Sequence, residues 1–456
     1  VCIQGLGYVG AAMATAVASA RDSKGQPIYD VIGVDLPNEV GISRIEAILK
    51  GQFPFLASDK SLISKLSEAH LVGNLSATFD QIVFSDAEII IVDVQMDIPF
   101  IDDEPQLQFE SFTNAIKSIG QHVNEGALVI VETTVPPGTC EKLVVPTLSF
   151  ELLKRGIKPD RVLVAHSFER VMPGENYLAS ITDYWRVFSG YTQEAGDACE
   201  HFLETVIDVQ NYPLTRLSSL TASETAKVLE NSYRAVNIAF IDEWTKYAEA
   251  VGIDLYEVVE AIKKRPTHSN IRSPGLGVGG YCLTKDPAFA PAAAKELFGK
   301  ELNFPFSKKA LNVNQNMPLH TVDRLESLLD NSIKGKRILI CGVSYRQDLG
   351  DTRYSPSETL IRKLIDDGAI VEAHDPYLKY WNEMKLELKE SLPPAKDFDA
   401  VIFAVSHSQY LELDLINWAS KGTCLLDTTG MFDKNQREKP RACGIRLESI
   451  GRADGL

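Results

Sequence analysis

Residues 1–18 read VCIQGLGYVGAAMATAVA, a short apolar run followed by three spaced glycines and a run of small residues. This pattern predicts a strand at residues 1–4, a tight turn, and a helix packed closely on the strand. A G-x-G-x-x-G sequence in that setting is typical of a dinucleotide-binding βαβ unit. In such a unit Gly5 makes the turn, Gly7 leaves room for a pyrophosphate, and Gly10 allows close helix packing. We therefore expect an α/β protein that binds a dinucleotide through Gly5, Gly7, Tyr8, Val9 and Gly10.

A second apolar run, residues 31–34, ends at Asp35, and no Arg immediately follows it. The spacing from the glycines fits the acid that binds the adenosine ribose, although a solvated Asp at a strand end is the alternative interpretation. A 2′-phosphate about 4 Å from this carboxylate would be repelled by roughly 4 kcal/mol per unit charge at an effective dielectric of about 20, or about a thousandfold in affinity. The sequence therefore predicts NAD, and not NADP, as the cofactor.

The composition narrows the class of protein. A chain of 456 residues, with 45% hydrophobic and 24% charged residues, is expected to form two or three globular domains. Its net charge of −16 argues against nucleic acid or an anionic membrane as the main partner, and no apolar run is long enough to span a bilayer. Seven scattered Cys without a C-x-x-C pair indicate reduced thiols, a cytoplasmic location, and neither disulfides nor a metal site.

The α/β alternation continues with predicted strands at residues 88–94, 127–133 and 161–165, and with a predicted helix at residues 106–123. Thr133 ends the second of these strands and Thr134 follows it, and Glu169 follows the third. Ligands of parallel sheets bind at the carboxyl ends of the strands. We therefore expect these side chains at the ligand-binding edge, although Glu169 alone would more often be a solvated loop carboxylate.

A long helical pattern runs over residues 221–251, and Thr221-Ala222-Ser223-Glu224 has the form of a capping box at its start. Its stripe includes Phe240, Trp244 and Tyr247, and its length is on the order of 45 Å. A helix of this kind joins two domains, two chains, or both. Lys227 and Asn231 lie four residues apart, so they share one face and could reach one ligand, or form an ordinary surface pair.

The segment GLGVGGYCLTKDP, residues 275–287, places one thiol, Cys282, in a glycine-rich loop. Its glycines permit positive φ angles and close approach to a ligand. One interpretation of this segment is a flexible loop with a half-buried thiol that has no role in catalysis. Because a thiolate is the nucleophile and a nearby cation favours it, Cys282 beside Lys285 is a candidate nucleophile.

The last third returns to α/β alternation, with predicted strands at residues 337–341, 369–373, 400–405 and 423–426. A loop that contains Arg346 and Arg353 follows the first of them. These arginines suit phosphate contacts, and an ion pair with Asp348 or Asp351 is the alternative.

Together, and in this order, the motifs at residues 5–10, 133–138, 169–170, 227–231, 277–286 and 342–353 resemble the UDP-glucose/GDP-mannose dehydrogenase family over essentially the whole chain. The resemblance implies two Rossmann-like doubly wound domains joined by a central helical domain. The expected boundaries are residues 1–205 for the NAD-binding domain, 206–315 for a central dimerisation domain and 316–456 for the UDP-binding domain. It also implies a homodimer, and two NAD-dependent oxidations that convert the sugar C6 alcohol to a uronate of the kind used in polysaccharide biosynthesis.

The resemblance also implies roles for single residues. Cys282 matches the nucleophile, which forms a thiohemiacetal and then a thioester, and Lys227 with Asn231 matches the pair that holds the developing oxyanion. Glu169, Asp286 and Thr134 match groups that position water and move protons. The residues that the resemblance assigns to substrate binding are Arg170, Arg272, Gly279, Gly280, Tyr281, Arg346 and Arg353, while Thr133 joins the cofactor site.

The substrate pattern is mixed. Residues 169–174 and 270–275 look like the branch that acts on UDP-N-acetylhexosamines, whereas residues 283–286 look more like the UDP-glucose branch. We expect a UDP-N-acetylhexosamine, with UDP-glucose as the alternative. A non-covalent reductase or binding protein of the β-hydroxyacid dehydrogenase type is a further alternative, but it would need neither the cysteine nor the C-terminal domain.

Overall fold

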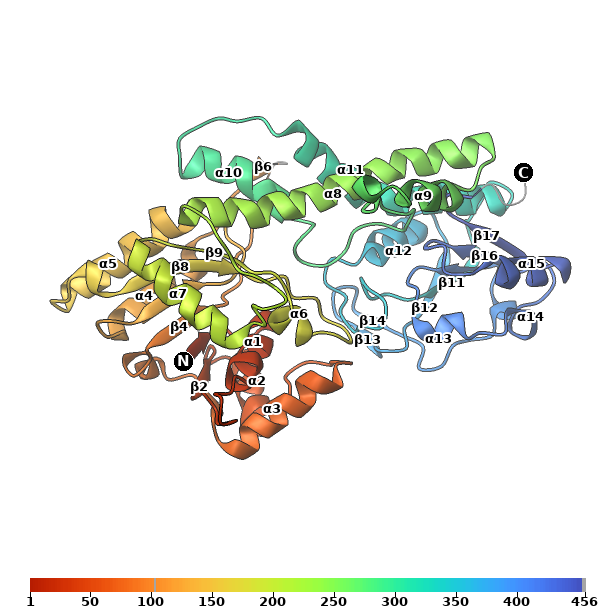
Figure 1. Ribbon diagram of the computed structural model, residues 1–456. Coiled ribbons are helices and arrows are strands. Elements are labelled where there is room, and N and C mark those ends of the chain that lie inside the picture. Colours follow the sequence, from red (N-terminus) through yellow and green to blue (C-terminus); the bar gives the residue numbers. More distant parts are fainter. Residues whose placement is uncertain (102–103, 453–456) are drawn as a thin grey trace. The chain divides into compact units, whose positions relative to one another are not determined.

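The computed structural model describes residues 1–101 and 104–452. The chain forms two compact units, one of residues 1–230 and 288–303, the other of residues 231–287 and those from 304 onward. Each unit contains a parallel sheet with helices packed around it (Figure 1). The expected α/β architecture, with two doubly wound units and a long connecting helix, is confirmed.

The first unit is built on an eight-stranded sheet in the order β10-β9-β8-β7-β4-β1-β2-β3. Its strands run parallel except that β9 is antiparallel to β8. The bounds are β1 (Cys2–Gln4), β2 (Val31–Val34), β3 (Leu75–Thr78), β4 (Ile89–Val92), β7 (Leu128–Val131), β8 (Leu163–Phe168), β9 (Val187–Gly190) and β10 (Thr215–Arg216). The third strand expected from the sequence at residues 161–165 thus begins later, because residues 159–161 form a 3₁₀ turn that starts at a proline.

The helices of this unit pack in pairs, α1 against α3 and α4 against α5 (Figure 1). Asp59 caps α3 by accepting hydrogen bonds from the N–H groups of Ser61 and Leu62. The helix expected at residues 106–123 is α4, which begins at residue 110. The bounds are α1 (Tyr8–Ala18), α2 (Glu39–Leu49), α3 (Lys60–Val72), α4 (Glu110–His122), α5 (Val145–Lys154), α6 (Ala179–Thr182), α7 (Gln193–Val206) and α10 (Phe289–Glu296), and β5 (Phe100–Ile101) pairs with β6 (Glu104–Pro105) in antiparallel orientation.

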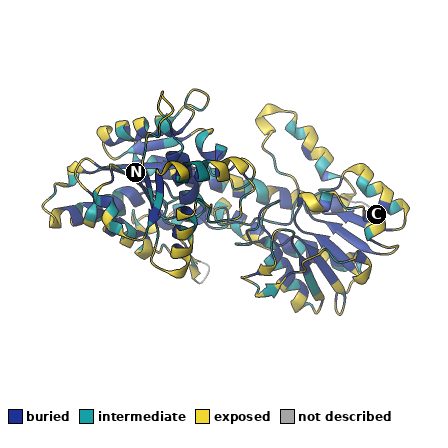
Figure 2. Cartoon of the chain, turned by 90° about the horizontal axis from the view of Figure 1, so that it is seen from below, coloured by how far each residue is buried: buried dark blue, intermediate teal, exposed yellow. Residues whose placement is uncertain are grey.

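The second unit contains a five-stranded parallel sheet in the order β12-β11-β15-β16-β17. Apolar side chains fill both of its faces, and Figure 2 shows the strands of each sheet as buried. The strands are β11 (Arg337–Cys341), β12 (Ile370–His374), β13 (Tyr380–Trp381), β14 (Leu386–Glu387), β15 (Ala400–Phe403), β16 (Cys424–Asp427) and β17 (Arg446–Ser449). The helices are α9 (Leu255–Lys263), α11 (Pro305–Leu328), α12 (Pro356–Asp366), α13 (Ser408–Leu411), α14 (Leu415–Trp418) and α15 (Lys434–Ala442).

Helix α8 (Leu220–Val251) has 32 residues and supplies its first part to one unit and the rest to the other. The expected capping box at Thr221–Glu224 is wrong, because the helix begins one residue earlier and the side chain of Ser219 accepts the N–H of Ala222. Glu224 instead accepts hydrogen bonds from the N–H groups of Gly138 at 2.5 Å and Cys140 at 2.7 Å. Its carboxylate therefore fastens the loop after β7 to α8.

Burial raises the pKa of Glu224 to about 7. A carboxyl whose pKa is higher in the folded chain contributes stability that is present below its ordinary pKa, near 4.5, and is lost as the pH rises through 7. That shift corresponds to about 3 kcal/mol. Glu224→Gln is neutral at every pH, so its deficit in Tm relative to wild type should be smaller at about pH 8 than at about pH 5. Calorimetric scans at both pH values measure this difference.

The matched control is Glu125→Gln, which changes an exposed carboxylate paired with Arg161. Its Tm difference from wild type should be the same at both pH values. An equal deficit for Glu224→Gln at both pH values would show that Glu224 does not titrate in this range.

Candidate active site

The glycine loop after β1 is shaped by contacts within the chain. Gly5 has φ of +98°, and a Cβ on Gly10 would lie 1.8 Å from the carbonyl oxygen of Gly5. Both positions therefore require glycine for the turn and for the approach of α1. A Cβ on Gly7 would meet nothing within 4 Å. The space beside Gly7 is thus left for a ligand.

The start of α1 fits a pyrophosphate. Gly7 is the N-cap residue, no side chain caps the helix, and its first turn carries no acidic residue. The N–H groups and the dipole of such a helix start favour an anion. Tyr8 is fixed in place, because its carbonyl oxygen accepts the hydroxyl of Tyr177 at 2.6 Å and its ring stacks on Phe55 at 4.0 Å between centroids.

Asp35 follows β2 and its carboxylate accepts three hydrogen bonds: from the N–H of Leu6 at 3.1 Å, from the N–H of Leu36 at 2.7 Å and from the guanidinium of Arg44 at 3.2 Å. The sequence argument placed no cation beside this carboxylate. Arg44 lies nine residues along the chain, on α2, so only the packing of that helix brings it to Asp35. A basic residue on the helix after the acid is the signal that could have revealed it.

Glu169 and Lys227 lie together, both within the first unit. The Nζ of Lys227 donates to the carbonyl oxygen of Glu169 at 2.6 Å and lies 3.8 Å from its carboxylate. The carboxylate of Glu169 also accepts the N–H of Val171. The ammonium further lies 5.4 Å from the centre of the Phe168 ring. Both site residues are buried, so an ammonium and a carboxylate are held in a fixed arrangement at the end of β8.

Arg170 is bound to groups in its own unit. It forms a forked ion pair with Glu230 at 2.9 Å and donates to the carbonyl oxygen of Trp185 at 2.5 Å. Thr133 and Thr134 are partly buried just beyond β7, in the loop that Glu224 fastens. Arg170 must leave its partners if it is to bind a substrate.

The glycines of the Cys282 loop pack tightly within the second unit. A Cβ on Gly279 would lie 2.5 Å from the Cβ of Tyr345, and one on Gly280 would lie 2.9 Å from the Tyr345 ring. The backbone of Gly280 also donates to the carbonyl oxygen of Arg353 at 3.1 Å. The loop is therefore held against the segment after β11, and it leaves the thiol of Cys282 exposed.

Asp286 is fully buried four residues beyond Cys282. Its carboxylate accepts a hydrogen bond from the side chain of Asn231 at 2.7 Å and forms an ion pair with Lys285 at 3.0 Å. Lys285 also lies 4.3 Å from the centre of the Tyr281 ring. The expectation that Lys227 or Lys285 favours the thiolate of Cys282 stays a prediction.

The segment after β11 repeats the geometry of the first glycine loop. Gly342 has φ of +97°, and Asp375, at the end of β12, accepts the N–H groups of Val343 at 2.9 Å and Ser344 at 3.1 Å. Asp375 is buried, and its carboxylate is engaged by these N–H groups. The second unit thus has the turn of a nucleotide-binding fold, but the carboxylate after its second strand is not exposed to a ligand. The side chain of Arg346 lies exposed in the same loop.

The remaining arginines differ in their partners. Arg353 forms a forked ion pair with Asp351, with a closest distance of 2.6 Å, which is one of the alternatives that the sequence left open. The Nε of Arg272 is buried and has no hydrogen-bond partner among residues 1–101 and 104–452. Burial lowers the pKa of Arg272, and the charge of Arg234 lowers it further.

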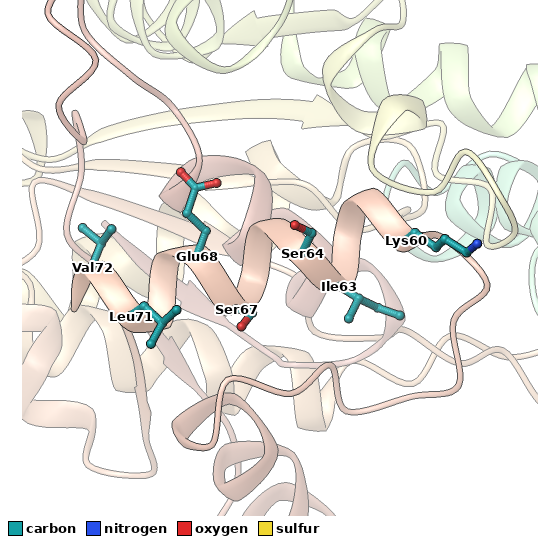
Figure 3. Close-up of a pocket in the computed structure, with 7 residues that line it drawn as sticks. All are labelled: Lys60, Ile63, Ser64, Ser67, Glu68, Leu71 and Val72. Carbon is teal, nitrogen blue, oxygen red and sulfur yellow. The ribbon is translucent and has the colours of Figure 1, made fainter.

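A groove along α3, with a volume of about 670 Å³, lies outside the candidate site (Figure 3). It is lined by Lys60, Ile63, Ser64, Ser67, Glu68, Leu71 and Val72. No helix in the part of the chain that the structure describes is long and apolar enough to cross a membrane. Nor do the described residues include a cluster of three or more His, Cys, Asp or Glu side chains suited to a metal.

Comparison with known proteins gives matches along most of the chain. Models of the UDP-glucose/GDP-mannose dehydrogenase family match over residues 1–205 for the NAD-binding domain, 221–316 for the central domain and 339–434 for the UDP-binding domain. UDP-N-acetyl-D-mannosamine dehydrogenase of Methanocaldococcus jannaschii is 31% identical, over 99% of this chain and 96% of its own length. NDP-N-acetyl-D-galactosaminuronic acid dehydrogenase of Ralstonia nicotianae is 28% identical, over 95% of this chain and 96% of its own.

Solved structures agree with these matches. The structure of UDP-D-ManNAc dehydrogenase from Pyrococcus horikoshii superposes with a TM-score of 0.84 and 27% identity, and the match covers 100% of both chains. The glycine loop, the uncapped start of α1 and the space beside Gly7 fit the NAD that the family's first domain binds. This chain therefore belongs to the UDP-glucose/GDP-mannose dehydrogenase family, the NAD-dependent nucleotide-sugar dehydrogenases.

Proposed function

We propose that this protein oxidises the C6 alcohol of a UDP-N-acetylhexosamine to the carboxylate, with Cys282 as the covalent nucleophile. The observation that carries the proposal is the exposed thiol of Cys282 in a tightly packed glycine loop, four residues before the buried Asp286. The relatives named as dehydrogenases of N-acetylated sugars support the sugar class. The glycine loop and the start of α1 would hold NAD, which would supply the acceptor for the hydride in each of the two oxidations.

The protein's own groups would carry the rest of the chemistry. The thiolate of Cys282 adds to the C6 aldehyde, which gives a thiohemiacetal. Loss of the second hydride and of the hydroxyl proton leaves a thioester, and water displaces the thiolate to release the carboxylate and two protons. We assign Lys227 and Asn231 to the developing oxyanion, since cations and amide donors stabilise such charge.

The carboxylates divide the remaining tasks. Glu169 faces the ammonium of Lys227, and we assign it with Thr134 to the water that attacks the thioester. Asp286 holds the side chain of Asn231, so its first task is to orient that amide. Arg346, which is exposed in the loop after β11, is assigned to the diphosphate of the substrate, as is Arg353 if it leaves its ion pair with Asp351. Arg272 is assigned to substrate binding.

We also infer a homodimer formed through α8. Leu229, Tyr233, Phe240, Trp244, Tyr247 and Val251 on this helix are between 45% and 65% exposed. The rings of Phe240, Trp244 and Tyr247 contact one another in succession. Aromatic side chains exposed in a continuous row are typical of interface cores.

The nucleophile is tested by substitution. Cys282→Ser should keep the fold and NADH binding but lose four-electron turnover, accumulating at most an aldehyde-level or covalent species, and Cys282→Ala should trap no substrate. Mass spectrometry of the protein mixed with substrate and NAD measures the trapped species. The control is Cys443→Ala, which removes the other exposed thiol and should keep full activity. Uronate formation by Cys282→Ala at a near wild-type rate would exclude the covalent route and show that the sugar is oxidised without a bond to Cys282.

The substrate is tested by NADH production with a panel of UDP- and GDP-sugars. A pocket that hydrogen-bonds the acetamido group should reject a sugar that lacks it, so UDP-N-acetylhexosamines should exceed UDP-glucose in kcat/KM by at least about a hundredfold. If UDP-glucose gives the higher kcat/KM, the protein is a UDP-glucose 6-dehydrogenase.

The dimer is tested by light scattering at micromolar concentration. Wild type should have twice the mass of the chain, and the double variant Phe240→Ser, Trp244→Ser should shift toward the monomer, because the aromatic row supplies the apolar area of the interface. The control is Phe150→Ser on α5, which removes an aromatic that is 60% exposed elsewhere. A monomeric wild type would contradict the inference.

A further inference from the structure

Asp35 and Arg44 form an ion pair at the position where a Rossmann fold distinguishes its two cofactors. One carboxylate oxygen of Asp35 accepts the N–H of Leu6 and the guanidinium of Arg44, and the other accepts the N–H of Leu36. The side chain of Asp35 is 8% exposed and that of Arg44 is 30% exposed. The carboxylate therefore sits inside, against the glycine loop, and the guanidinium forms the outer side of the pair.

Arg44 has support besides Asp35. Its guanidinium lies 5.5 Å from the centre of the Phe55 ring, and Phe55 stacks on Tyr8 with an angle of 17° between the planes. Tyr8 belongs to the glycine loop, and its backbone is fixed by Tyr177. An arginine over an aromatic face is held by attraction between the cation and the ring. Loss of the Asp35 carboxylate would therefore leave Arg44 close to its present position.

The two side chains favour opposite ligands. A carboxylate accepts the 2′-hydroxyl of NAD and repels the 2′-phosphate of NADP, whereas an arginine nearby accommodates that phosphate. Only one nitrogen of Arg44 is engaged by Asp35, so a guanidinium edge remains for a second, forked contact. This chain thus has both the carboxylate that suits NAD and the arginine that suits NADP. Asp35 neutralises the charge of that arginine.

We propose that Arg44 is a specificity-determining residue. Its guanidinium can bind the 2′-phosphate of NADP, but the ion pair with Asp35 keeps that guanidinium occupied. The inference rests on the NAD-binding fold and not on the identity of the sugar. In wild type the arginine offsets part of the charge of Asp35, so the preference for NAD should be weaker than the thousandfold expected for an uncompensated carboxylate. That full penalty should appear when Arg44 is removed.

The experiment measures the dissociation constants of NADH and NADPH by their fluorescence, with purified protein and no sugar. Arg44→Ala should raise the ratio of the NADPH constant to the NADH constant by at least about tenfold, because Asp35 is then uncompensated. Asp35→Ser should lower the ratio by at least about a hundredfold, because Arg44 becomes free for the phosphate. The double variant, with Asp35→Ser and Arg44→Ala together, should have a ratio at least about tenfold higher than that of Asp35→Ser, because no arginine is left for the phosphate.

Lys50→Ala is the matched control, since Lys50 lies on the turn that ends α2 and forms an ion pair with the exposed Glu46. Its ratio should stay within about twofold of wild type, since a distant exposed cation is screened. An unchanged ratio in Arg44→Ala would overturn the proposal, even if the Asp35 variants fail to fold. Equal NADPH binding by Asp35→Ser and the double variant would overturn it as well. Because no sugar is present, neither result depends on the proposed oxidation.

Discussion

Hydrogen bonds from loops to buried carboxylates hold this molecule's candidate site together. Glu224 binds two N–H groups of the loop after β7, and Asp375 binds two in the loop after β11. Asp286 binds the amide of Asn231, and Asp35 binds the N–H of Leu6. A carboxyl group can accept several donors at once, and leaving its oxygens without hydrogen bonds inside a protein would be costly. Each of these loops is therefore held by a carboxyl group, and breaking the hydrogen bonds to that group would cost free energy.

Local sequence patterns predicted the parts of this arrangement that depend on neighbours in the chain. The strand, the glycine turn and helix α1 all lie within residues 1–18, and the turn at Gly5 has the positive φ that the pattern required. The carboxylate contacts were not predictable in the same way. Glu224 and Gly138 lie 86 residues apart, and the residues around Glu224 fit a capping box equally well. Spacing alone cannot distinguish a helix cap from a bond to a distant loop.

The glycines of the Cys282 loop are required by side-chain packing as well as by backbone conformation. The sequence argument assigned them to positive φ and to the approach of a ligand, and Gly280 has φ of +81°. Gly279 has no positive φ, yet a Cβ there would lie 2.5 Å from the Cβ of Tyr345 and 2.9 Å from Pro356. Its lack of a side chain is needed by packing within the protein. The absence of side chains at Gly279 and Gly280 thus lets the loop pack closely against Tyr345 and Pro356.

Most cations of the candidate site form ion pairs with carboxylates of the protein, and an anionic ligand has to compete with these carboxylates. Lys227 contacts Glu169, Lys285 contacts Asp286, and Arg353 contacts Asp351. An anionic substrate must compete with a carboxylate for each of them, so general attraction to anions is weak in a chain whose net charge is −16. Arg346 has no ion pair among the described residues, so the diphosphate that we propose it binds would displace no carboxylate from it.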